Sequence, residues 1–243
     1  MAFLFYCIII LFLPLAQPFF ITPMETVVKI LILLHATAGG FGLLTGPGAL
    51  LVKKGSKIHR LFGKIFYWSM IVASCFALVI SNLPKHHNFF LFTIGLFTLY
   101  MVLSGRRFLA LKMLFRNQTA SAFDWVLAIL MAIAGSCMII YGWSISSENT
   151  IGIVLIVFGF ISLRMVGSSI LLFRKINVKP NSWLIEHIGR MIGANIAAFT
   201  AFLVVNNNNF LPPLVAWLSP TVVFTPLIIY YTLKEARKVK IRT

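Results

Sequence analysis

Long apolar blocks follow one another along this chain, and short polar loops separate them. A block of about 20 apolar residues, folded as a helix, is long enough to cross the hydrocarbon core of a bilayer. Only 11% of the residues are charged and 60% are hydrophobic, whereas a soluble domain carries about 25% charged residues. The pattern predicts an all-α fold, a polytopic transmembrane helical bundle with seven or eight membrane-spanning helices. The well-marked helices are expected at 26–52, 61–83, 89–105, 123–144, 150–170, 185–205 and 211–233.

The N-terminal apolar segment, residues 1–22, allows two interpretations. It is interrupted by Pro14 and Pro18, and its start, MAFLFYC, has no basic residue of the kind that opens a signal peptide. The stretch PLAQ resembles a weak cleavage site, so a signal-like segment is one interpretation and an eighth membrane-spanning helix is the favoured one. Residues 23–243 are then one helical membrane domain with short loops and a basic tail.

The positive charge is distributed unevenly along the chain. The formal net charge is +16, which on a soluble protein would suggest a nucleic-acid partner. Here the lysines and arginines gather at 53–64, 106–116, 174–190 and 234–242, and the intervening loops hold only Lys29 and Lys85. This alternation follows the positive-inside rule. It predicts a multi-pass protein of the cell membrane with a cytoplasmic C-terminus. It predicts a cytoplasmic N-terminus if the first segment spans, anionic lipid head groups as partners, and no nucleic acid.

A few polar side chains lie inside the predicted spans, where an unpaired charge costs about 2.5–3.5 kcal/mol. His35 precedes a ladder of small residues, Ala38, Gly42 and Gly46, that suits close helix packing. Its simplest role is a neutral imidazole bonded to a neighbouring helix. The other polar intramembrane candidates are Asn195, Arg164 and Asp124.

Two ion pairs are expected from this set. Arg164 and Asp124 have similar expected depths in adjoining helices, so we expect them to pair. Glu186 and Arg190 are four residues apart and are expected to pair along one helix.

Two further histidines suggest a cofactor site. His59 and His187 both lie at cytoplasmic helix ends, at depths that match within about one turn. A b-type haem is held in membranes by imidazoles from different helices at equal depth, and Arg60, Lys64 and Arg190 are close enough in sequence to meet its propionates. His35 lies too deep to share the same iron. The alternative role for His59 and His187 is anchoring at the membrane interface.

Other functions have weaker support. The chain has no HExxH, GxSxG or P-loop pattern and only five acidic residues, so we lean towards a protein that is not an enzyme. A small-solute or ion transporter could use His35, Asn195 and Arg164 as a polar pathway. A non-catalytic factor that binds lipid or a partner protein through its basic face is the third class. Apart from the possible haem, the sequence leaves the presence of a metal open.

Three stretches carry a resemblance to a known family. They are LHATAGGFGLLTGPGALLVKKGSKIHRLFGKIFYWSM, LYMVLSGRR and HIGRMIGANIAAFTAFLVVNN. Together they are similar to the domain of unknown function 2306 family of bacterial polytopic membrane proteins, over residues 28–232. The resemblance implies a helical bundle in a membrane and no particular activity, substrate or cofactor. Relatives tend to carry an acidic residue near the position of Ser168 and Ser169.

Overall fold

The computed structural model describes residues 23–147 and 149–240, so the predictions made for the N-terminal apolar segment lie outside the described residues. The described part is all-helical, and each of its seven helices is long and apolar enough to cross a membrane. This confirms the predicted helical membrane bundle. The helices are α2 (Pro23–Leu51), α3 (Lys57–Ile80), α4 (Phe89–Phe108), α5 (Ala122–Ile145), α6 (Thr150–Phe173), α7 (Ser182–Val205) and α8 (Pro213–Lys240).

Short polar caps begin several of these helices. Ser56 precedes α3, and its hydroxyl accepts a hydrogen bond from the backbone N–H of His59 at 3.1 Å. Asn88 precedes α4 and accepts in the same way from Leu91 at 2.9 Å. Such caps satisfy N–H groups that the first helical turn leaves without partners. The loops therefore define where the apolar helices start.

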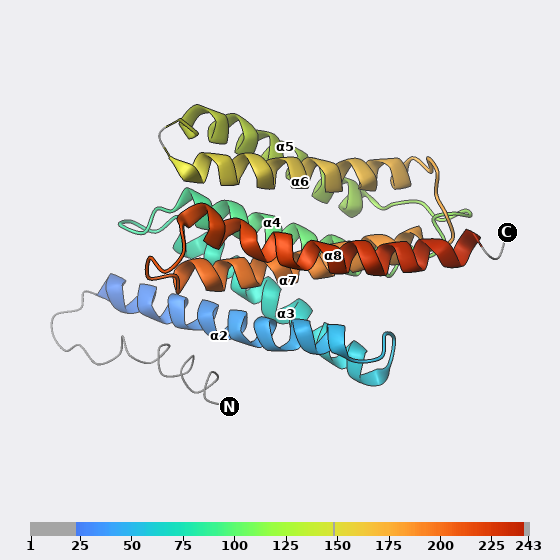
Figure 1. The fold of residues 1–243 in the computed structure, drawn as a ribbon, viewed down its shortest axis with the longest axis horizontal. Coiled ribbons are helices and arrows are strands. Elements are labelled where there is room, and N and C mark those ends of the chain that lie inside the picture. Colours follow the sequence, from blue (N-terminus) through green and yellow to red (C-terminus); the bar gives the residue numbers. More distant parts are fainter. Residues whose placement is uncertain (1–22, 148, 241–243) are drawn as a thin grey trace.

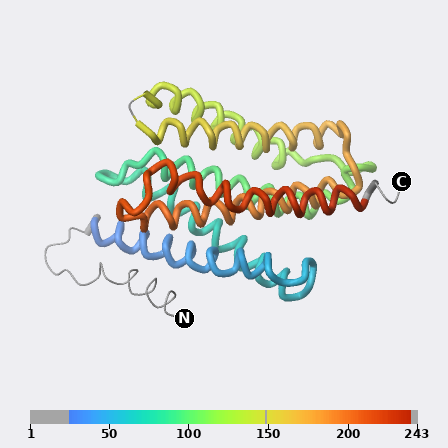
Figure 2. The backbone as a smooth tube through the Cα atoms, viewed as in Figure 1, coloured from blue at the N-terminus to red at the C-terminus, as the bar shows by residue number. Residues whose placement is uncertain are grey.

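The helices run up and down, and alternate loops meet at the same end (Figure 1). The loops at 52–56, 109–121 and 174–181 and the end of α8 gather at one end, which we call the basic end because most lysines and arginines lie there. The loops after α3, α5 and α7 lie at the opposite end. The tube in Figure 2 follows the same path, with α2 and the α5–α6 hairpin on opposite flanks.

Helix α4 is the centre of the bundle. The most apolar window of α4 is 61% buried within the protein, against 11% for the corresponding window of α2. Met101 and Val102 of α4 are fully buried, and Phe97 of α4 stacks edge-on against Phe158 of α6 at 5.3 Å between ring centroids. The outer faces of the other helices carry exposed apolar side chains such as Trp143, as expected for surfaces that meet lipid.

Helices α5 and α6 pack backbone to backbone through glycines. A Cβ atom added to Gly142 would lie 2.7 Å from the carbonyl oxygen of Gly152, and one added to Gly152 would lie 2.6 Å from the carbonyl oxygen of Gly142. A Cβ atom added to Gly159 would likewise lie 2.7 Å from the carbonyl oxygen of Gly135. Small residues allow this close approach, which provides dispersion contacts where lipid offers no hydrophobic drive. We call this contact the glycine seam.

Candidate functional site

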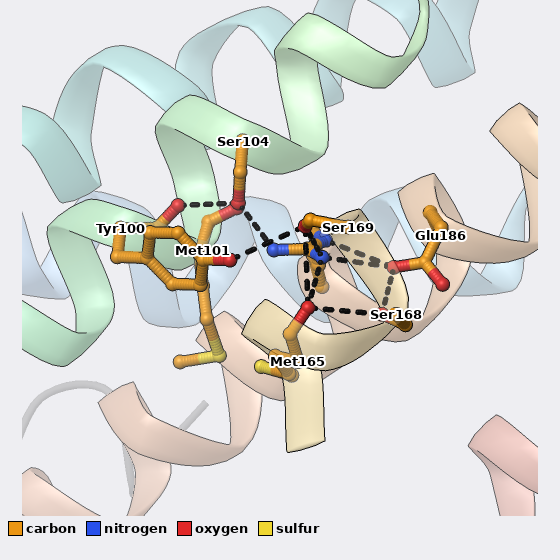
Figure 3. A network of polar contacts seen from close by, with 8 residues as sticks. Tyr100, Met101, Ser104, Met165, Ser168, Ser169 and Glu186 are labelled. Atoms are coloured by element: carbon orange, nitrogen blue, oxygen red, sulfur yellow. Dashed lines mark hydrogen bonds and ion pairs between the residues drawn. The ribbon is translucent and has the colours of Figure 1, made fainter. Parts of the chain in front are cut away.

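Arg190 of α7 is the largest side chain that the described part of the protein encloses completely, with 1% of its surface exposed. Its Nη1 donates to Ser104 Oγ at 2.8 Å, and its Nη2 donates to Ser169 Oγ at 2.7 Å and to Met165 O at 2.9 Å. Nε and Nη2 both donate to Glu186 Oε2, at 3.2 and 2.9 Å. The guanidinium thus links α4, α6 and α7, and Figure 3 shows these partners converging from the three helices.

Two aromatic rings complete the enclosure of this guanidinium. The ring centroids of Tyr100 and Phe108 lie 5.1 and 4.8 Å from Arg190 Cζ. A cation over aromatic faces is stabilised electrostatically, and more so when water is excluded. We call Arg190 with Tyr100, Ser104, Ser168, Ser169 and Glu186 the arginine cluster.

The expected pair of Glu186 and Arg190 is confirmed, with Nη2 and Oε2 2.9 Å apart. The carboxylate of Glu186 also accepts a hydrogen bond from Ser168 Oγ at 3.1 Å. The expected role of Arg190 beside haem propionates needs correction, because the guanidinium is buried and bonded to protein groups instead of facing the loops. Residue counting along α7 gave the depth of Arg190 but not the direction of its side chain.

The second ion pair differs from the predicted one. Asp124 pairs with Arg107 at the end of α4, where Nε and Nη2 each donate to a different carboxylate oxygen at 2.8 Å. Asp124 also accepts hydrogen bonds from the backbone N–H and the hydroxyl of Ser121, which closes the first turn of α5. The predicted pairing of Asp124 with Arg164 is therefore wrong. Arg164 is exposed on α6, on a face turned away from the bundle.

His59 and His187 lie at the basic end, close enough for a charge on His59 to act on His187. His59 Nδ1 is 3.0 Å from the carbonyl oxygen of Ala49 in α2, and His187 Nδ1 is 2.9 Å from that of Gly105 in α4. A carbonyl oxygen can only accept, so each Nδ1 donates. In the neutral ring, Nε2 then keeps its lone pair. Both imidazoles are held by a neighbouring helix in the tautomer that a metal ligand needs.

The surroundings of His59 include cations and a glycine. Arg60 and Lys64 are exposed on α3, and Arg106 is exposed on α4 near enough to His187 to act on it electrostatically. Gly63, one turn after His59, would meet nothing within 4 Å if it carried a Cβ atom. A Cβ atom at position 63 of α3 would therefore contact no neighbouring side chain or backbone.

Lys54 closes the end of α2 at the same place. Its Nζ donates to the carbonyl oxygens of Leu50 and Ala49, the latter at 3.2 Å and shared with His59. The Lys54 ammonium also lies 5.0 Å from the ring centroid of Tyr231 in α8. Partial burial lowers the pKa of Lys54 below its ordinary value. A cation at a helix C-terminus is favourable because the last carbonyl groups carry partial negative charge.

His35 has the structural role that the sequence suggested. Its Nδ1 lies 2.8 Å from the carbonyl oxygen of Ala73, so it ties α2 to α3. The small-residue ladder of α2 contacts two helices: Gly42 faces Met70 of α3, and Gly46 faces Asn195 of α7. His35 lies eleven positions before Gly46, about 16 Å along the helix, so the side chains of His35 and Asn195 belong to different levels.

Asn195 and Thr200 of α7 are buried, with 3% and 0% of their surfaces exposed. The Oδ1 atom of Asn195 and the hydroxyl of Thr200 have no hydrogen-bond partner among the described residues. The sequence singled out Asn195 as a lone polar residue in a span. It did not single out Thr200, Tyr100 or Ser104 as polar site residues, because hydroxyl residues are common in membrane helices, where they can bond to their own backbone.

A group of three metal-ligating side chains is not formed within residues 23–147 and 149–240. Within those residues, the two histidines at the basic end are therefore not part of a protein-only metal site with three or more ligands.

Comparisons with known proteins leave the family undetermined. No family model, no curated protein and no solved structure matches the chain. The similarity to the domain of unknown function 2306 family therefore stays a prediction. The chain is, on its fold, a multi-pass helical membrane protein.

Proposed function

We propose that this membrane protein carries a b-type haem between His59 and His187 and takes part in electron transfer at the basic end of the bundle. The observation that carries the proposal is the pair of imidazoles from different helices, each with Nδ1 bonded to a backbone carbonyl oxygen and Nε2 left as an acceptor. When bound in this way, the group would supply one-electron chemistry.

The residues fit this group in their chemistry. Backbone carbonyl partners fix the two rings and raise the basicity of Nε2, as second-shell groups do for metal-bound histidines. Arg60, Lys64 and Arg106 are exposed cations that would meet propionate carboxylates. A cavity of about 10 Å³ at this end is lined by neither histidine and is far too small for a porphyrin, so the proposal depends on the chemistry of the two imidazoles and the exposed cations.

The visible spectrum tests the proposal directly. Protein purified in mild detergent from haem-supplemented cells is expected to give a sharp reduced α-band, and His59→Ala and His187→Ala are each expected to abolish it. His35→Ala is the matched control, because His35 is also a membrane histidine bonded to a backbone carbonyl oxygen. A colourless protein, or an α-band that survives both substitutions, would rule the haem out.

A second candidate is passage of a small ion or solute along α7. It is favoured by the buried Oδ1 of Asn195, which has no partner among the described residues and faces Gly46 of α2. An uncompensated polar atom in a membrane is costly and is often functional. Uptake of radioactive sodium into proteoliposomes, compared between the parent protein and Asn195→Leu, tests this candidate. If proteoliposomes with the parent protein take up no more sodium than liposomes without protein, sodium is excluded as the transported ion.

The basic end supports a proposal about orientation and lipid. Lys57, Arg60 and Lys64 are exposed and spaced i, i+3, i+7 on the first turns of α3, so they share a face. We place this end in the cytoplasm, where anionic head groups would attract it. Labelling of single cysteines at Lys179 and Asn207, on intact cells with an impermeant maleimide, tests the orientation, and only the Asn207→Cys variant should react.

A further inference from the structure

A small cavity separates the two ion-pair clusters of the basic end. Its volume is about 10 Å³. Ten residues line it: Tyr100, Ser104, Arg107, Phe108, Leu111, Asp124, Leu127, Ala128, Ser169 and Phe173. The lining thus comes from α4, the loop that follows it, α5 and α6. It brings residues of the arginine cluster, Tyr100 and Ser169, next to the Arg107–Asp124 pair.

The size and polarity of the cavity limit what it can hold. A space of about 10–15 Å³ accommodates one water molecule, and cavities with several polar groups in their walls hold water whereas apolar ones stay dry. Five of the ten lining residues carry hydroxyl, guanidinium or carboxylate groups. The only charges among them, Arg107 and Asp124, neutralise each other at 2.8 Å. The lining therefore suits a neutral ligand over an ion.

One lining group lacks a good partner. The hydroxyl of Tyr100 lies 3.4 Å from Ser169 Oγ, at the far limit for an O–H···O hydrogen bond, whose usual length is about 2.7–2.8 Å. Tyr100 has only 3% of its surface exposed. Ser169 Oγ already accepts from Arg190 and donates to Met165 O. A buried tyrosine hydroxyl usually finds a closer partner than this.

We propose that this cavity binds one internal water molecule, which bridges the Tyr100 hydroxyl and Ser169 on one side to the Asp124 carboxylate on the other. The water joins the arginine cluster to the Arg107–Asp124 pair. The result is a continuous polar connection from the partly exposed Arg107 to Glu186, the residue beside His187. It also ties the start of α5 to α4 and α6, at the same end of the hairpin where Trp125 packs on Phe173.

Radiolytic hydroxyl-radical labelling read by mass spectrometry tests this proposal, because a bound water generates radicals inside the protein. Tyr100 is expected to be labelled strongly in spite of its burial, whereas Phe97, equally buried at 4% exposure and away from the cavity, is expected to stay protected. Rates are normalised to those of the unfolded chain. Protection of Tyr100 equal to that of Phe97 would overturn the proposal.

A cavity-filling variant separates an internal water from access by bulk solvent. Ala128 lines the cavity, and Ala128→Val would place methyl groups in it. The labelling of Tyr100 is expected to fall several-fold in this variant. Ala77→Val makes the same change at a buried alanine elsewhere and should leave the labelling of Tyr100 unchanged. Undiminished labelling in Ala128→Val would mean that no water occupies the cavity, and the proposal would fail.

Discussion

The glycine seam between α5 and α6 and the arginine cluster between α4, α6 and α7 solve the same problem in opposite ways. Lipid is as apolar as a leucine side chain, so helices in a membrane are not driven together by the hydrophobic effect. At the glycine seam, backbones approach until carbonyl oxygens touch the positions of absent Cβ atoms. At the arginine cluster, a buried charge satisfies groups from three helices. One contact depends on shape and the other on polar compensation.

The difference predicts different sensitivities. At the glycine seam, a change of charge nearby should leave stability unchanged, whereas an added side-chain atom should lower it. The reason is that the glycines face backbone atoms of the other helix, which cannot move aside. The arginine cluster should tolerate small changes of volume but not the loss of a partner, because each lost partner leaves a buried polar group unpaired.

Removal of Arg190 is expected to have the largest effect. Arg190→Leu leaves Glu186, Ser104 and Ser169 without their donor, and breaking a buried ion pair in this way costs about 3–5 kcal/mol. The free energy of unfolding in mixed micelles, titrated with a denaturing detergent, measures the loss. The double variant Arg190→Leu/Glu186→Leu should lose less than the single variant, since it leaves no uncompensated carboxylate. A double variant that is less stable than Arg190→Leu would contradict the assignment.

An added methyl group in the glycine seam is expected to have the next largest effect. In Gly152→Ala the new Cβ would lie 2.6 Å from the carbonyl oxygen of Gly142, and such overpacking costs about 1–3 kcal/mol. Gly167→Ala is the control on the same helix, because a Cβ there meets nothing within 4 Å. The control should be neutral or gain up to about 1 kcal/mol from helix propensity. Equal stability of the two variants in the same titration would show that the seam is not tight.

Loss of the Asp124 charge is expected to cost less than loss of Arg190. Asp124→Asn keeps the shape but weakens both bonds from Arg107, whose side chain is 35% exposed and can be solvated. The expected loss is about 1–2 kcal/mol, below most of the range of about 1.5–3 kcal/mol for hydrogen bonds to a charged group, because Arg107 stays partly solvated. Arg164→Gln, which removes a charge from the exposed face of α6, should change stability by less. If Arg164→Gln lowered the thermal unfolding temperature more than Asp124→Asn, the pairing of Asp124 with Arg107 would be contradicted and a pairing with Arg164 favoured.

The smallest effect on stability is expected from substitution of Asn195, whose Oδ1 has no hydrogen-bond partner among the described residues. Asn195→Leu removes an unpartnered Oδ1 and keeps a side chain of similar size against Gly46. We expect thermal stability to be unchanged or slightly raised, because the unmade hydrogen bond no longer imposes its cost. Thr200→Val is the parallel substitution on the same helix. A clear loss of stability for Asn195→Leu would reveal a polar partner in the membrane and weaken the ion-passage candidate.

Much of the fold could be predicted because it depends on local properties. The helices fall close to the expected ranges, since twenty apolar residues between polar loops have few alternatives in lipid. The largest differences are at helix ends. α3 begins at Lys57, where a start at 61 was expected, and the basic tail continues α8 as a helix to Lys240, where an end at 233 was expected. An ion pair supports that extension: Lys238 Nζ lies 2.6 Å from Glu235 Oε1, three residues earlier on the same helix.

The candidate site was predicted less completely, for a geometrical reason. The pairing of Glu186 with Arg190 follows from helical spacing alone, whereas the partner of Asp124 depends on how the loop between α4 and α5 returns the chain. Arg107 was expected just past a helix end at 105 and Arg164 inside a span, and the sequence does not give the rotation of each helix about its axis, which decides their partners. Arg107 turns towards α5, and Arg164 turns outward.

The sequence by itself therefore determined that this chain forms a membrane bundle and which of its ends is basic. It also predicted that His59 and His187 lie near one level, because helix length and loop charge are properties of contiguous residues. The tertiary structure alone decided that Arg190 is enclosed, that Asp124 belongs to Arg107, and that both imidazoles bond through Nδ1 to a backbone carbonyl oxygen. These features depend on which face each helix turns to its neighbours, and that choice is made by packing among all of them together.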